Sequence, residues 1–345
     1  MDKLGKNLKK IRLLKNLSLK EAGQLLGMSA TAINKYEKGY LIPNSSKVIE
    51  FANAYNVNCI DILRVYEEPE LKFTSFKKNE KLTEKKLEVL KMVIQEEVAK
   101  YLEVIELNSI TAQNISLRKY KCSTLEDAEQ ASNKFREHIK LSSKYPISDL
   151  ISILENLGIL IIELEDKNNY YEGFEGFSEV VNNIPIIVMK ENRTDVCKYR
   201  YTLAHELAHL LLKIENPQVN EEKLCYRFAS SLLMPKEAVI NEFGNNRRNI
   251  SIYELVVFKI EYKVNYKDII TRLKELNIIT EYLYKKLSAS HIIDEGITFQ
   301  PEVSHQFKKL VHKLETDDII TINKACELLG TTLNEYNREN NNYRY

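Results

Sequence analysis

The residues best suited to chemistry are His205, Glu206 and His209, which form an H-E-x-x-H motif. Residues four apart on an α-helix lie about 40° apart around its axis, so both imidazoles project from one face and can bind one ion. Neutral imidazole is a ligand that suits Zn²⁺. Glu206 follows the first histidine, where it can take a proton from an activated water and pass it to a leaving amine. The motif therefore predicts a zinc-dependent peptidase with Glu206 as general base.

Leucines on the same predicted helix, residues 198–213, indicate how that helix is held. They recur on the side away from the two imidazoles, a pattern typical of a helix that packs on a core. These leucines are Leu203, Leu207, Leu210 and Leu211. We expect the face of the helix opposite the imidazoles to be buried against a core.

Two imidazoles do not complete a catalytic zinc site, which needs a third protein ligand and one position left for water. The next predicted helix, residues 221–235, carries Glu221, Glu222 and Cys225 near its start. Either carboxylate is suitable as the third ligand. For Cys225 the pattern favours a small buried residue on the core face over a ligand.

The N-terminal residues 7–63 are predicted to form short helices. Ser18 and Ser29 are good N-caps, and Gly27 is a good helix terminator between them. Two short helices joined by the three-residue turn Gly27-Met28-Ser29 form a helix-turn-helix unit.

This region, SLKEAGQLLGMSATAINKYEKGYLIPNSSKVIEFANAYNV, resembles the Cro/repressor-type helix-turn-helix, with Ile33, Tyr36 and Pro43 at matching positions. In such domains the second helix enters the major groove of DNA with its N-terminal residues nearest the bases. The resemblance implies five base-reading candidates: Ala30, Thr31, Ala32, Asn34 and Lys35.

The chemistry and charge of this module agree with a DNA partner. Asn34 can pair with adenine, and Lys35 can contact a base or a phosphate. Residues 1–66 hold 11 Lys and Arg against 5 Asp and Glu, although the whole chain carries only +1. Leu19 departs from the pattern, because glutamine is common there and supplies a phosphate contact. A helix-turn-helix used only for dimerisation is the alternative, but the positive charge favours DNA binding.

The segment RYTLAHELAHLLL and the helix after it resemble the ImmA/IrrE-type metallopeptidases, a gluzincin-like family. Matches at Phe228, Ala229 and residues 232–235 set the register of that second helix. In this register the third zinc ligand falls on Glu222, and Glu221 is the fallback. Two positions depart from the family pattern, since Cys225 replaces alanine and Tyr226 replaces Asn or Asp. In related enzymes that polar residue holds a histidine ligand in place.

The resemblance also implies a substrate and a setting. In this family the peptidase cleaves a transcriptional repressor, which relieves genes for stress response, DNA repair or mobile-element transfer, and fusion to an N-terminal helix-turn-helix is common. We therefore expect a DNA-binding zinc endopeptidase whose substrate is a protein, foremost another helix-turn-helix repressor. The alternative is a transcriptional regulator or toxin–antitoxin component whose peptidase fold is inactive or senses a signal, which Tyr226 favours modestly.

Composition sets the remaining bounds. The 345 residues contain no apolar run long enough for a membrane span, and the five cysteines form no motif, which favours the cytoplasm. A homodimer on a palindromic site is compatible with the helix-turn-helix. The other histidines lack a partner pattern and are interpreted as structural or solvent-facing: His138, His291, His305 and His312.

The predicted fold is mainly α with a small β-sheet. It comprises an N-terminal five-helix helix-turn-helix domain, an α+β metallopeptidase core and a helical C-terminal region. The predicted boundaries are 1–66 for the DNA-binding domain, 67–124 for a linker and a long amphipathic helix, 125–245 for the peptidase core and 246–345 for the C-terminal region.

Overall fold

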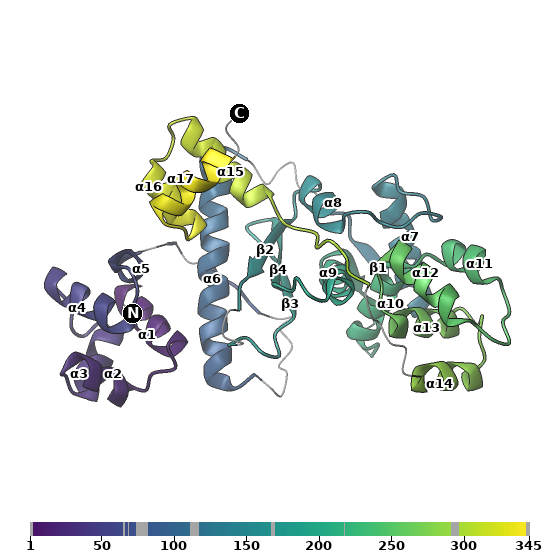
Figure 1. Cartoon of the computed structure of the whole chain (residues 1–345), viewed down its shortest axis with the longest axis horizontal. Coiled ribbons are helices and arrows are strands. Elements are labelled where there is room, and N and C mark those ends of the chain that lie inside the picture. The colour runs from purple at the N-terminus through teal and green to yellow at the C-terminus, as the bar shows by residue number, and fades with distance from the viewer. Residues whose placement is uncertain are drawn as a thin grey trace. The chain divides into compact units, whose positions relative to one another are not determined.

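Helices dominate the chain, with seventeen helices and five short strands among the residues that the structure describes. The computed structural model describes residues 3–64, 66–67, 69–73, 82–110, 117–166, 170–216, 218–290 and 297–342 (Figure 1). Backbone contacts divide the chain into two compact units. Unit 1 comprises 1–70, 78–103 and 166–174, and unit 2 comprises 71–77, 104–165 and 175–345. The four boundaries expected from the sequence stay a prediction.

Unit 1 contains the five N-terminal helices that the sequence predicts. They are α1 (Lys3–Leu14), α2 (Leu19–Leu26), α3 (Ala30–Glu37), α4 (Ser45–Tyr55) and α5 (Cys59–Leu63). Their buried apolar side chains form one core, in which Leu8, Ile33 and Phe51 are completely buried. A buried ion pair between Arg12 and Glu37 ties α1 to the end of α3. The first part of α6 (Glu84–Leu107) belongs to the same unit.

The turn between α2 and α3 follows the predicted capping pattern. Ser18 and Glu21 form a reciprocal capping box at the start of α2, and Ser29 caps α3 by accepting from the backbone of Ala32. Gly27 ends α2 in the left-handed conformation at φ 62°, which glycine adopts without steric cost. A Cβ atom on Gly23 would lie 2.5 Å from the backbone oxygen of Met28, so only glycine fits where the turn crosses α2.

Unit 2 contains the strands and the remaining helices. The strands are β1 (Tyr120–Cys122), β2 (Leu160–Leu164), β3 (Gly176–Val181), β4 (Ile184–Lys190) and β5 (Leu212–Ile214). Among the helices, α7 (Leu125–His138) packs on β1, α8 (Leu150–Asn156) on β2 and α9 (Val196–Leu211) on β3 and β4, while α10 (Glu221–Leu233) packs on α7 and α9. The helices after them are α11 (Lys236–Phe243), α12 (Ile252–Tyr262), α13 (Tyr266–Glu275), α14 (Glu281–Ala289), α15 (Gln306–Thr316), α16 (Ile322–Leu329) and α17 (Leu333–Asn342).

Two small sheets frame α9. The three-stranded sheet has the order β2-β4-β3, with β2 parallel and β3 antiparallel to the central strand β4. The other sheet is a parallel pair, β1 and β5. The sequence analysis did not predict this pair, because three-residue strands leave almost no alternation to detect. Strand β5 begins directly after the last residue of α9, so the pair fixes the end of that helix.

Two helices of unit 2 have clear ends. Helix α8 begins at Leu150 behind the cap Asp149, whose side chain accepts from the backbone of Ser152. Helix α7 ends at His138. The predicted linker includes Phe73, whose ring stacks on Phe177 of β3 with centroids 5.1 Å apart. Among the described helices, none combines the length and the apolar character that crossing a bilayer requires.

The tight turn in unit 1 yields a stability prediction. Replacing Gly23 with alanine should destabilise the helix-turn-helix by about 1–3 kcal/mol, because the added methyl group must push the backbone of Met28 away. Hydrogen–deuterium exchange on the full chain measures this as lost protection in α2 and α3. Gln24→Ala, on an exposed neighbour in the same helix, is the control. Equal protection in both variants would show that the turn relaxes at no cost.

Candidate metal centre

The H-E-x-x-H motif lies on α9, a largely buried helix. Leu203 and Leu207 are completely buried, and Leu210 and Leu211 are nearly so, as the leucine pattern predicts. Asp195 caps the helix by accepting from the backbone of Lys198. The rings of His205 and His209 lie with centroids 5.0 Å apart, and at least nine-tenths of each side chain is buried.

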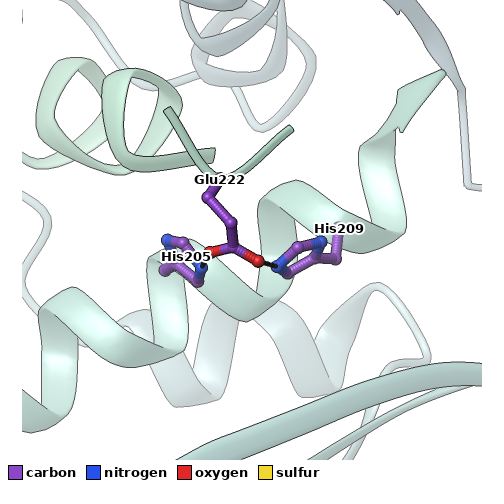
Figure 2. Close-up of side chains that lie close together, drawn as sticks. All are labelled: His205, His209 and Glu222. Carbon is purple, nitrogen blue, oxygen red and sulfur yellow. Dashed lines mark ion pairs between the residues drawn. The ribbon is translucent and has the colours of Figure 1, made fainter. Parts of the chain in front are cut away.

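Glu222, on the first turn of α10, reaches both imidazoles. Its Oε2 lies 3.1 Å from Nε2 of His205, and its Oε1 lies 3.6 Å from Nε2 of His209. Figure 2 shows the carboxylate lying between the two rings. The three ligand atoms all lie within 4.8 Å of one another. Two imidazole nitrogens with one carboxylate oxygen are the donor set of hydrolytic zinc sites, so these residues fit a zinc ion.

Glu221 contacts the other nitrogen of His209. Its Oε1 lies 2.9 Å from Nδ1, and about half of its side chain is exposed. An ionised carboxylate only accepts hydrogen bonds, so this contact makes Nδ1 the donor and leaves the lone pair on Nε2, the nitrogen facing Glu222. The structure therefore separates the two glutamates that the sequence left as alternatives. Glu222 faces the ligand nitrogens, and Glu221 orients a ring.

Cys225 is completely buried in the core, as the sequence analysis favoured, yet its sulfur also lies 3.6 Å from Nδ1 of His209. Together with Glu221 it forms a second group of possible ligands around the same ring. Burial raises the pKa of the Cys225 thiol well above its usual range, which disfavours the thiolate that binds metals. This second group is therefore the weaker candidate.

Glu206 points toward strand β3. The hydroxyl of Ser178 donates to its Oε2 at 2.8 Å, and a Cβ atom on Gly176 would lie 2.9 Å from its Cγ. Burial raises the pKa of the Glu206 carboxyl, while the two histidines and the Ser178 hydroxyl oppose the rise. The sequence analysis did not identify Ser178 or Gly176 as partners of the motif, because they come from a strand almost thirty residues earlier.

Tyr226 stands at the family's Asn or Asp position. Its ring packs against the ring of His205 with centroids 4.4 Å apart and an angle of 46° between the planes. Nδ1 of His205 is buried and has no hydrogen-bond partner within the described part of the chain. At this position Tyr226 gives His205 ring packing, and no hydrogen bond to Nδ1 is present among the described residues.

The base-reading candidates lie at the start of α3. Thr31 and Lys35 are exposed, and Ala30, Ala32 and Asn34 are half-buried. Leu19, the departure noted in the pattern, packs against the core of the helix-turn-helix. These positions leave a DNA-reading face available, and the base contacts stay a prediction.

Three of the remaining histidines lie within the described residues and outside the group of candidate ligands. His138 and His305 are exposed, and Nδ1 of His312 lies 2.9 Å from the hydroxyl of Tyr336. His291 lies outside the described residues.

Comparison with protein families now adds to this geometry. Residues 8–62 match the helix-turn-helix family, and residues 154–274 match the IrrE N-terminal-like domain, a peptidase family. The chain thus carries a segment similar to the helix-turn-helix family ahead of a segment similar to the IrrE N-terminal-like domain. The IrrE N-terminal-like match spans β2 to α13 and so contains His205, His209 and Glu222. No curated protein matches the chain.

Two solved structures are similar over most of their length. Bacillus thuringiensis PlcR, in complex with the peptide PapR7 and DNA, shares 14% identity over 96% of this chain and 82% of that chain, with a TM-score of 0.20. The Streptococcus dysgalactiae SHP pheromone receptor Rgg2 shares 14% identity over 84% of this chain and 100% of that chain, with a TM-score of 0.17. At these scores neither similarity bears on the IrrE N-terminal-like domain or its site.

The two neighbouring glutamates give a prediction about metal affinity. Glu222→Gln removes the anionic ligand, so we expect zinc affinity to fall more than about 100-fold. Glu221→Gln keeps an oxygen that can accept from Nδ1 of His209, so we expect less than about a tenfold change. Competition with a chromophoric chelator measures both affinities on the purified chain. The reverse order of the two effects would make Glu221 the ligand.

Proposed function

We propose that this protein is a DNA-binding zinc endopeptidase that cleaves another protein. The observation that carries the proposal is the convergence of His205, His209 and Glu222. Glu206 follows His205 directly and is hydrogen-bonded to Ser178 of β3. The IrrE N-terminal-like match supports a peptidase, and the helix-turn-helix match supports a DNA partner. A cytoplasmic location is part of the proposal, and the five free cysteines support it.

In this proposal His205, His209 and Glu222 hold the ion. A bound zinc ion supplies Lewis acidity, which acidifies water and polarises a peptide carbonyl. Glu206 accepts the proton of the attacking water and transfers it to the leaving amine. Ser178 holds Oε2 of Glu206 by donating its hydroxyl proton. Burial favours the neutral carboxyl, which stabilises Glu206 in the protonated state that it must pass through.

The proposed substrate is a helix-turn-helix repressor. A peptidase held on DNA by its own helix-turn-helix meets other proteins bound nearby at a raised effective concentration. A repressor on a neighbouring operator is such a protein, and its cleavage would release the genes it controls. Stress response and mobile-element transfer are the settings that the family resemblance suggests for this circuit.

Cleavage can be tested directly with the general base. When the zinc-loaded chain is incubated with the repressor encoded beside it, we expect a discrete cut that Glu206→Gln reduces at least about a thousandfold. Mass spectrometry of the new N-terminus identifies the cut. Glu206→Gln should retain its zinc, so metal content measured on the same sample separates lost catalysis from a lost ion. Equal cleavage by wild type and variant would exclude this role for Glu206.

The DNA-binding part has its own test. If the basic module binds phosphates, the apparent affinity of the full chain for duplex DNA should fall steeply between 50 and 200 mM salt, by roughly 10-fold or more. Fluorescence anisotropy at several salt concentrations measures the slope. Lys35→Ala, on the exposed face of α3, should weaken binding, whereas Lys85→Ala on α6 should not. A flat salt response would count against DNA binding by this module.

A second function is favoured by one observation. The buried Nδ1 of His205 has no hydrogen-bond partner among the residues described, because Tyr226 packs its ring there. A histidine ligand without such a partner is less basic and less firmly oriented. The alternative is therefore a transcriptional regulator or toxin–antitoxin component whose zinc fold senses a signal. Zinc-dependent operator binding without cleavage of any candidate repressor would favour it.

A further inference from the structure

The C-terminal helices α16 and α17 repeat the capping pattern and the turn of the N-terminal helices α2 and α3. Helix α16 has eight residues, as α2 does, and the segments 321–332 and 18–29 correspond one for one. Thr321 caps α16 as Ser18 caps α2, each accepting from the backbone three residues on. The correspondence begins at the same cap and runs without an insertion.

The turn after α16 has the same backbone as the turn after α2. Gly330 has φ 64° and ψ 28°, and Gly27 has φ 62° and ψ 30°. The next backbone N–H bonds back in the same way, from Thr331 to Cys326 at 3.0 Å and from Met28 to Gly23 at 2.8 Å. This pattern, a left-handed glycine followed by a backward hydrogen bond, fixes the direction in which the second helix leaves.

The second helix also begins in the same way. Thr332 caps α17 by accepting from the backbone of Glu335, just as Ser29 caps α3. The same two positions are buried in both repeats. Ala325 corresponds to Ala22, and both are completely buried. Tyr336 corresponds to Ile33, and at most one per cent of either is exposed.

Helix α15 precedes the second repeat and packs on it. The ring of Tyr336 on α17 stacks on His312 of α15 with centroids 5.0 Å apart. The packing differs from that of the first repeat, because α1 packs against α3 there, whereas α15 packs mainly against α16. The three helices, yellow in Figure 1, therefore form a helix-turn-helix of their own.

We propose that α15–α17 form a second DNA-reading module, which contacts base edges through Asn334, Asn337 and Arg338. This inference rests on the proposed DNA binding of the N-terminal module. Asn337 and Arg338 stand where Asn34 and Lys35 stand in α3, and all three proposed readers are exposed. Asparagine pairs with adenine and arginine with guanine in the major groove. Two amides beside a guanidinium match the donors and acceptors of base edges, and the three positions offer no aromatic or apolar anchor of the kind that protein interfaces favour.

The charge of the second module defines its part in binding. Residues 306–342 hold five Lys and Arg against six Asp and Glu, so this module attracts phosphates far less than the N-terminal one. The Glu335 carboxylate accepts from the backbone and hydroxyl of Thr332, at the helix cap. The basic module supplies the affinity, and the second module, tethered to it, adds sequence discrimination at a raised effective concentration.

Site selection from a random duplex library with the full-length chain tests this proposal. We expect wild type to recover a site with two sequence elements. The double variant Asn337→Ala/Arg338→Ala should lose one element and bind the wild-type site roughly 10- to 100-fold more weakly, the effect of losing one or two base contacts. Asn34→Ala/Lys35→Ala should lose the other element. Arg338→Lys, which keeps the charge but not the planar fork, should relax discrimination at one base.

Lys309→Ala is the matched control, because it removes one exposed positive charge from α15 of the same module. We expect both sequence elements to survive in it, and equal thermal unfolding of all variants excludes a folding defect. Recovery of the unchanged site, with unchanged affinity, by Asn337→Ala/Arg338→Ala would overturn the inference and leave α17 to a protein contact. A wild-type chain that selects no site at all would instead refute DNA binding by the N-terminal module, and the inference with it.

Discussion

The packing of α9 against α10 is the constraint on which the candidate metal centre depends. One helix supplies both imidazoles and the other supplies Glu222, so the three donors meet only where the helices cross. Leu207 on α9 and Phe228 and Leu232 on α10 are completely buried in the same core. Protein interiors are so closely packed that a change of even one methylene in a core side chain displaces its neighbours. The geometry of the centre is therefore set by apolar side chains that never touch an ion.

Strand β3 contributes what the two helices do not supply. Ser178 donates a hydrogen bond to Glu206, and Gly176, which has no side chain, leaves space for the Glu206 side chain. Strand β4 pairs with β3 along its whole length and fixes that strand against α9. Glu206 and the two histidines share α9, so their spacing follows from the helix, whereas the direction of the Glu206 side chain depends on the packing of β3 against α9. The candidate general base and the candidate ligands therefore depend on both elements of one core.

The sequence predicted those parts of the site that depend on local spacing. His205, Glu206 and His209 share one helix, so their relation follows from the helical repeat alone, and the caps at Ser18 and Ser29 are equally local. The contact between Ser178 and Glu206 depends on tertiary packing across separate elements, and no periodicity encodes it. The β1–β5 pair was too short to detect, and only the tertiary structure shows which imidazole nitrogen each of Glu221 and Glu222 faces.

The two helix-turn-helix repeats show how far local signals reach. A capping hydroxyl, a left-handed glycine and a second capping hydroxyl produce a similar turn twice, but Cys326 stands where Gly23 stands, and α17 packs less closely on α16 than α3 packs on α2. Burial already differs, since Leu25 is more than half exposed and the corresponding Leu328 is buried. Charge differs more, because the first module is strongly basic and the second is not. The helix caps and the left-handed glycine thus specify the shape of the turn. They place no constraint on surface charge, which determines how strongly a module binds a polyanion.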